Sequence, residues 1–206
     1  MSLSRSGWAA AAFRGCTVVG LGCLLLTGCA SAAQRTGTAQ LPAGPAVDWR
    51  NTTYTVTCDG IVPGGFRATV VDGSARIPAD GSRPPHYEYY DIRVTATAGG
   101  DVDGDAAPDT VVLLDCSPQP SNGVVQEVQI FSSTGRPLGA LPSPRTLQRG
   151  VQPPPVYDPA GLSVKDGEIV TAMSAYGPDD SHATGPSVPL TVRWRFDGQE
   201  FVRASS

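Results

Sequence analysis

The sequence predicts a mainly β protein with a single antiparallel domain, built as a sandwich or an open barrel. From Val47 onward, short runs of β-branched and aromatic residues alternate with turn residues, and no segment of helical length repeats its apolar residues every 3.6 positions. Two Asp-Gly pairs lie between apolar alternations, which is typical of β-hairpins. About 160 residues follow Ala46, enough for one domain with one core.

The expected strands follow one another at short intervals. They are Thr52–Cys58, Phe66–Val71, Tyr87–Ala98, Thr110–Asp115, Val124–Ser132, Glu168–Ala175, Val188–Phe196 and Glu200–Arg203. We expect Asp166-Gly167 and Asp197-Gly198 to form two-residue turns, because such turns favour positive φ angles. Alternation before the second turn directs one set of apolar side chains to the core. These are Leu190, Val192, Trp194 and Phe196.

Residues 133–160 contain seven prolines. Each proline removes a backbone donor, so this stretch cannot lie inside a sheet. We expect a long loop or a crossover at a sheet edge.

The first 28 residues have the pattern of a signal peptide. Arg5 and Arg14 are the only charged residues there, and the apolar run Thr17–Leu26 leads into Leu26-Thr27-Gly28-Cys29. This tetrapeptide resembles the lipobox of bacterial lipoproteins, which implies diacylation of Cys29 and cleavage before it. An ordinary secretory signal and an uncleaved anchor are the alternatives, although a run of about ten residues is too short to cross a hydrocarbon core of about 30 Å.

Residues 29–46 are small, polar and interrupted by glycine and proline. As a flexible tether they would have a root-mean-square reach of roughly 20–25 Å. The β-rich domain, residues 47–206, would then lie on the extracytoplasmic face of the cell membrane. A single lysine, with abundant arginine, alanine, glycine and proline, favours a high-GC source, and the chain resembles small actinobacterial lipoproteins without an assigned activity.

Charge and cysteine usage restrict the partners and the compartment. The net charge of −4 becomes −6 when residues 1–28 are removed, so nucleic acid is not an expected partner. Cys16 and Cys23 leave with the signal peptide and Cys29 carries lipid, so Cys58 and Cys116 remain as an even pair, which predicts a disulfide outside the cytoplasm. A metal or redox pair is the alternative, but neither a neighbouring histidine nor a C-x-x-C spacing is present.

The segment from Asp101 to Asp109 has carboxylates at its first, third, fifth and ninth positions. Ca²⁺ binds six to eight oxygen atoms, and a tight loop could direct Asp101, Asp103, Asp105 and Asp109 inward beside the carbonyl of Ala107. The alternative is a solvated acidic turn whose aspartates accept hydrogen bonds from nearby backbone N–H groups.

The pattern D-x-D-G-D-x-x-P-D followed by Thr110-Val111-Val112-Leu113 resembles the calcium loops of FG-GAP and VCBS repeats. The resemblance implies Ca²⁺ held by the four aspartates and the Ala107 carbonyl. It covers one copy, so a β-propeller is not expected. The sixth position is Ala106 instead of the usual glycine, which costs about 1–2 kcal/mol if the backbone there is left-handed.

No catalytic residue is predicted, since the sequence contains none of the common nucleophile, zinc or phosphate-loop motifs. The run Asp179-Asp180-Ser181-His182 contains a hydroxyl, an imidazole and two carboxylates. Adjacent residues on an extended chain point in opposite directions, so we do not expect Ser181 and His182 to share the hydrogen bond that activates a nucleophile. Tyr87, Tyr89 and Tyr90 either belong to the core or, if exposed, bind a glycan or a protein.

These observations favour a membrane-anchored, non-catalytic binding or scaffolding module with a structural Ca²⁺ loop, whose partner is an envelope protein or a glycan. An envelope hydrolase with a metal-assisted site is the alternative. A sensor or assembly factor is a third possibility that the residues do not separate from the first.

Overall fold

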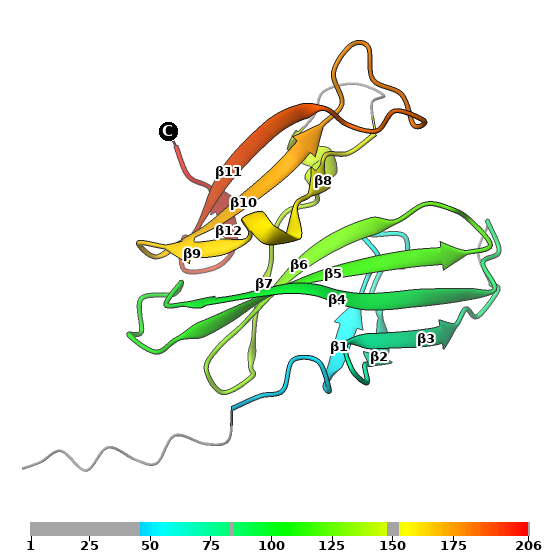
Figure 1. Cartoon of the computed structure of the whole chain (residues 1–206). Helices are drawn as coiled ribbons and strands as arrows, with labels where there is room; N and C mark the ends of the chain where they lie inside the picture. The colour runs from blue at the N-terminus through cyan, green and yellow to red at the C-terminus, as the bar shows by residue number, and fades with distance from the viewer. Residues whose placement is uncertain (1–45, 83–84, 148–152, 206) are drawn as a thin grey trace, which may run out of the picture. The chain divides into compact units, whose positions relative to one another are not determined.

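The computed structural model describes residues 46–82, 85–147 and 153–205 (Figure 1). The predicted signal peptide, Cys29 and nearly all of the predicted tether lie outside these residues. In the described part of the chain, no helix has the length and apolar character needed to cross a membrane.

Strands form nearly half of the described structure and helical turns very little of it. In chain order they are β1 (Thr53–Val56), β2 (Phe66–Thr69), β3 (Ser74–Pro78), β4 (Tyr89–Gly100), β5 (Asp109–Gln119), β6 (Val125–Phe131), β7 (Pro137–Ala140), β8 (Val156–Tyr157), β9 (Ser163–Lys165), β10 (Glu168–Ala175), β11 (Val188–Phe196) and β12 (Phe201–Arg203). Two 3₁₀ turns, η1 (Pro144–Leu147) and η2 (Pro159–Gly161), flank β8.

The strands form three antiparallel sheets. A central sheet has the order β3-β4-β5-β6-β7, and a second sheet has the order β12-β11-β10-β8, with β9 also paired to β10. The hairpin β1-β2 forms the third. The second sheet covers one face of the central sheet (Figure 1), and β1-β2 packs on the other. The mainly β prediction is therefore confirmed, and the packed sheets agree with a sandwich.

Strand β5 separates two hydrophobic cores. Val111 and Leu113 pack against the second sheet in what we call the C-terminal core, together with Ile169, Val192 and Trp194. The intervening side chains of β5 point to the β1-β2 hairpin and form what we call the N-terminal core. They are Val112, Leu114 and Cys116. Because both faces are covered, four consecutive apolar residues of β5 are fully buried.

A β-bulge at Thr95 lets the neighbouring strand β4 serve both cores. Val94 pairs with Leu114, but the next paired residue, Ala96, lies opposite Leu113. The extra residue reverses the alternation, so Val94 faces the N-terminal core and Ala96 the C-terminal core. The Thr95 hydroxyl donates a hydrogen bond to the carbonyl of Leu113, 3.2 Å away.

Most expected strands are present with shifted ends, and β10 and β11 have the expected bounds. The sequence did not predict β3, β7, β8 and β9, which are short strands at the margins of the sheets. β7 and β8 lie within the proline-rich stretch and at sheet edges, as the missing donors require. In β11, Val192 and Trp194 are buried and Leu190 and Phe196 pack against the same core, which confirms the predicted core face.

The first predicted two-residue turn is confirmed and the second is wrong. Asp166 and Gly167 both have positive φ between the paired residues Lys165 and Glu168. At the second turn Phe196 pairs with Phe201, so four residues connect the strands. The Asp197 carboxylate accepts hydrogen bonds from the N–H groups of the next two residues after Gly198, which supports the longer turn.

The structure joins Cys58 and Cys116 in a disulfide, with Cα atoms 5.4 Å apart. It connects the end of the β1 segment to β5. Beside it, the Glu127 carboxylate on β6 accepts hydrogen bonds from the Thr57 hydroxyl at 2.7 Å and from the N–H groups of Thr57 and Asp59 at 3.1 and 3.3 Å. The covalent bond and this carboxylate together hold the hairpin on the central sheet.

Replacing both cysteines (Cys58→Ala/Cys116→Ala) should lower the free energy of unfolding by about 4 kcal/mol, because the crosslink closes a loop with a sequence separation of 58. Denaturant unfolding of the variant and of the reduced parent should give similar losses. A loss below about 1 kcal/mol would show that the crosslink hardly restricts the unfolded chain.

Candidate functional site

The aspartate segment forms the connection of the β4-β5 hairpin. β4 ends at Gly100 and β5 begins at Asp109, and these two residues are paired. The strand, loop and strand context expected for the segment is therefore present.

Three of the predicted metal ligands converge in this loop. One carboxylate oxygen from each of Asp101, Asp103 and Asp109 lies within 4.8 Å of the others. Asp105 is outside this group, and its Oδ1 accepts a hydrogen bond from the N–H of Ala107 at 2.7 Å.

Asp109 has a buried oxygen atom without a partner. Asp109 is 1% exposed, and its Oδ2 accepts a hydrogen bond from the N–H of Val102 at 2.9 Å. Its Oδ1 is buried and has no hydrogen-bond partner among the described residues. Burial raises the pKa of Asp109, and the nearby charges of Asp103 and Asp105 raise it further. A buried acceptor without a hydrogen-bond partner lowers the free energy of unfolding by roughly 1–3 kcal/mol or more, and a bound cation would offset this loss.

The other aspartates also organise the loop backbone. Asp101 accepts hydrogen bonds from the N–H groups of Gly104 at 2.7 Å and Ala106 at 2.9 Å, and Asp103 accepts one from Asp105 at 3.2 Å. An acidic turn without an ion would have these bonds too. The unpartnered Oδ1 of Asp109 and the convergence of three carboxylates are features that such a turn does not need.

Three converging carboxylates, one of which has a buried oxygen without a partner, fit a cation such as Ca²⁺. Asp101, Asp103 and Asp109 would hold it, with Asp105 and the Ala107 carbonyl as the further donors predicted from the sequence. The chemistry that Ca²⁺ supplies in such a loop is neutralisation of the carboxylates and rigidity of the backbone.

The loop packs against the β9-β10 hairpin of the second sheet. An added Cβ on Gly100 would lie 2.6 Å from Cγ1 of Val164, so glycine is required at this approach. A shallow hollow of about 510 Å³ lies between the two elements. Asp101, Asp103 and Asp166 contribute its carboxylates.

Two other hollows lie on the central sheet or beside it. The first, of about 490 Å³, is lined mainly by residues of β3, β4 and β5, including Arg93 and Asp115. The second, of about 240 Å³, is lined in part by Phe66, Tyr87 and Tyr90. Arg93 and Asp115 were not predicted as site residues, although the alternation of charged and apolar residues along both strands places them on one face.

Tyr87, Tyr89 and Tyr90 are half-buried, so they are neither fully buried core residues nor fully exposed binding residues. Tyr90 stacks on Phe66 with ring centroids 4.9 Å apart and packs against the N-terminal core. Tyr89 lies under the guanidinium of Arg76, 4.2 Å from the ring centroid. Tyr87 contacts Tyr90 edge to face at 5.8 Å.

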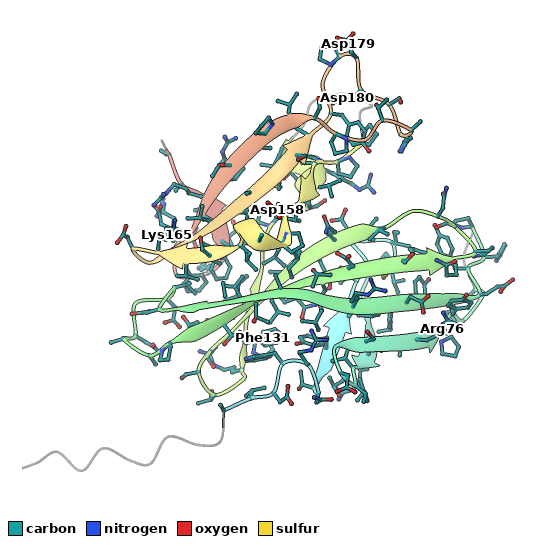
Figure 2. The ribbon with its side chains drawn as sticks, viewed as in Figure 1. Arg76, Phe131, Asp158, Lys165, Asp179 and Asp180 are labelled. Carbon is teal, nitrogen blue, oxygen red and sulfur yellow. A yellow bond between two sulfur atoms is a disulfide. The ribbon has the colours of Figure 1, made fainter. Side chains whose placement is uncertain are left out.

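The run from Asp179 to His182 lies in the loop between β10 and β11, and Figure 2 shows Asp179 and Asp180 at its outer end. The Ser181 hydroxyl lies 3.2 Å from the hydroxyl of Thr184. Hydrogen bonds from the N–H of Gly177 and from Ser187 lower the pKa of Asp180. The loop thus uses Asp180 and Ser181 to stabilise its own backbone.

Comparison with protein-family models, with curated proteins and with solved structures found no match for this chain.

Ala106 has a φ of 65°, in the left-handed region, so its β-carbon strains the loop as the sequence analysis anticipated. Ala106→Gly should raise the free energy of unfolding by about 1 kcal/mol, because relief of this strain exceeds the added flexibility of the unfolded chain. Thermal unfolding measures the gain. Ala107→Gly is the matched control, since Ala107 has no positive φ and should gain no stability.

Proposed function

We propose that the chain is a non-catalytic binding or scaffolding module, stabilised by Ca²⁺ and anchored by a lipid on Cys29 to the extracytoplasmic face of the cell membrane. The observation that carries the calcium assignment is the buried, unpartnered Oδ1 of Asp109 beside Asp101 and Asp103. The anchor is inferred from the lipobox resemblance in the sequence.

Calcium in this loop would act on the arrangement of the sheets. The loop connects β4 to β5, the strands shared by the two cores, and it packs on the β9-β10 hairpin. Neutralising its carboxylates therefore stabilises the junction between the central and second sheets. Extracellular modules bind Ca²⁺ with dissociation constants of roughly 10⁻⁴–10⁻³ M, so the ion would be constitutive outside the cell.

The disulfide supports an extracytoplasmic location, since such bonds persist in oxidising compartments. The acidic net charge does not favour nucleic acid as a partner. The proposed partners are the membrane, through the lipid, and an envelope protein or glycan, through the domain.

The hollow beside the loop favours binding over metal-assisted hydrolysis. Its walls are glycine, valine, phenylalanine and aspartate, and no histidine, serine, cysteine or lysine lines it in the described part of the chain. A hydrolase would need an oriented base there to activate a nucleophile beside the ion. Asp166 is the lining carboxylate that is not assigned to the ion, and it is exposed in the β9-β10 turn, where nothing among the described residues orients it. For this reason we propose a structural ion.

Thermal unfolding of the purified full-length chain in EDTA and in millimolar Ca²⁺ tests the metal assignment. Calcium at 100 times its dissociation constant stabilises the folded state by about 2.7 kcal/mol, which should raise Tm by roughly 5–10 °C. Asp103→Asn should abolish this increase, because it removes one of the three converging charges while keeping the shape of the side chain.

Asp197→Asn is the control, since this carboxylate also accepts backbone hydrogen bonds but lies in the β11-β12 turn. Its Tm should increase with Ca²⁺ as much as that of the parent. Equal Tm values for the parent in EDTA and in Ca²⁺ would instead identify the segment as an acidic turn.

Metabolic labelling with an alkyne fatty acid in a bacterial host tests the anchor. The chain should be labelled and recovered with the membranes, and Cys29→Ser should lose both properties because the acceptor thiol is absent. Cys23→Ser should be labelled normally, since Cys23 lies in the segment expected to be removed. Label retained in Cys29→Ser would contradict the lipobox interpretation.

A further inference from the structure

We propose that the hollow on the central sheet binds a neutral, hydroxyl-rich ligand, a segment of envelope glycan, through Arg93 and Asp115. The proposal rests on the binding role proposed above and specifies the ligand class. The hollow lies on the face of the central sheet that also carries the C-terminal core. That core ends at Leu113 on β5, and the next two residues on the same face, Asp115 and Ser117, line the hollow.

The sheet register aligns polar side chains in two rows across the strands. Ser74, Arg93, Asp115 and Gln126 are paired in sequence from β3 to β6. Arg76, Asp91 and Ser117 form the adjacent row. Two rows of polar side chains therefore line the hollow, and its volume is about 490 Å³. Figure 2 shows Arg76 at the end of the central sheet that lies away from Lys165, the last residue of β9.

Asp115 is a half-buried carboxylate held in place from one side. Its Oδ1 accepts a hydrogen bond from Nε2 of Gln126 at 2.9 Å, and Oε1 of Gln126 accepts one from the N–H of Tyr157 in β8 at 2.7 Å. Burial raises the pKa of Asp115. Its second oxygen makes no hydrogen bond with any residue that the structure describes. The chain therefore positions one carboxylate oxygen at the hollow and leaves it for another partner.

Arg93 provides the complementary donors. Its side chain is exposed, and it forms no hydrogen bond or ion pair within the described residues. It lies opposite Asp115 in the register and close enough to affect its pKa, yet the two form no ion pair. A guanidinium and a carboxylate that line one hollow without bonding each other can both bond the same ligand.

The remaining charges of the hollow neutralise each other. Arg76 donates two hydrogen bonds to Asp91, from Nε at 2.7 Å and from a terminal nitrogen at 2.9 Å. With Arg93 and Asp115 included, the lining has two positive and two negative side chains. A strongly anionic or cationic ligand would meet one repelling partner for each attracting one, so the charge pattern favours a neutral ligand.

The ligand must also donate and accept hydrogen bonds at adjacent positions. Vicinal hydroxyl groups of a sugar accept from a guanidinium and donate to a carboxylate at the same time. A peptide added as a strand would need free backbone groups, but β4 and β5 are each paired on both sides. The part of the floor formed by β4 and β5 therefore offers side chains and no strand edge, which favours a glycan there, whereas the outer edge of β3 is where a peptide strand would pair.

A glycan array tests the proposal. The full-length chain, in detergent and millimolar Ca²⁺, is applied to printed neutral bacterial and fungal glycans. The same slides carry sialylated glycans and dipeptides as the anionic and zwitterionic comparisons. We expect binding to neutral glycans. The strongest glycan is then titrated calorimetrically against Arg93→Lys, which keeps the charge and loses the fork geometry, and Asp115→Asn, which keeps an acceptor for Gln126.

Each substitution should weaken binding about tenfold or more, the effect of losing one charge-assisted hydrogen bond. Arg67→Lys is the matched control, because Arg67 is exposed on β2 away from the hollow and should bind like the parent. All variants should unfold within about 2 °C of the parent, which excludes misfolding as the cause.

The proposal is overturned if no neutral glycan binds, if only sialylated glycans or dipeptides bind, or if Arg93→Lys and Asp115→Asn bind as the parent does. None of these results bears on the calcium-dependent Tm or on Cys29 labelling, so failure of this site is distinguishable from failure of the proposed function.

Discussion

The structure depends on the burial of β5 from both faces. Four consecutive apolar side chains of this strand alternate between the second sheet and the β1-β2 hairpin, so each layer attaches to the same strand. Full burial of one such side chain stabilises the fold by roughly 1.5–3 kcal/mol. The bulge at Thr95 extends this arrangement to β4, which otherwise could present apolar residues to one core alone. The β4-β5 hairpin is accordingly the most constrained part of the domain.

Both candidate sites lie on this hairpin. Its connecting loop brings Asp101, Asp103 and Asp109 together, and its strands carry Arg93 and Asp115 on the polar part of one face. A binding group is useful when its supporting backbone does not move, because little ordering is then required on binding. The hairpin meets this condition, since its strands are paired on both sides and connect to the disulfide through Cys116.

The two sites differ in how charge is managed. In the loop, negative charges gather around a buried oxygen without a partner, an arrangement that a cation stabilises. In the hollow, charges of both signs balance, and the Arg93 guanidinium and one oxygen of Asp115 have no hydrogen-bond partner within the described residues. The pattern of the loop suits a bound ion that stabilises the fold, and the pattern of the hollow suits a neutral ligand that binds reversibly.

The sequence by itself determined the strands with strong alternation, the Asp166-Gly167 turn, the pairing of Cys58 with Cys116 and the spacing of the aspartates. Each is a local pattern, or follows from counting cysteines, so no knowledge of distant contacts is required. The tertiary structure decided which faces are covered, because burial on both sides of β5 and the reversal at Thr95 depend on strands far away in the chain. It also decided which side chains line the hollow, because the polar row across the sheet comes from four strands whose register makes its members neighbours. The row consists of Ser74, Arg93, Asp115 and Gln126.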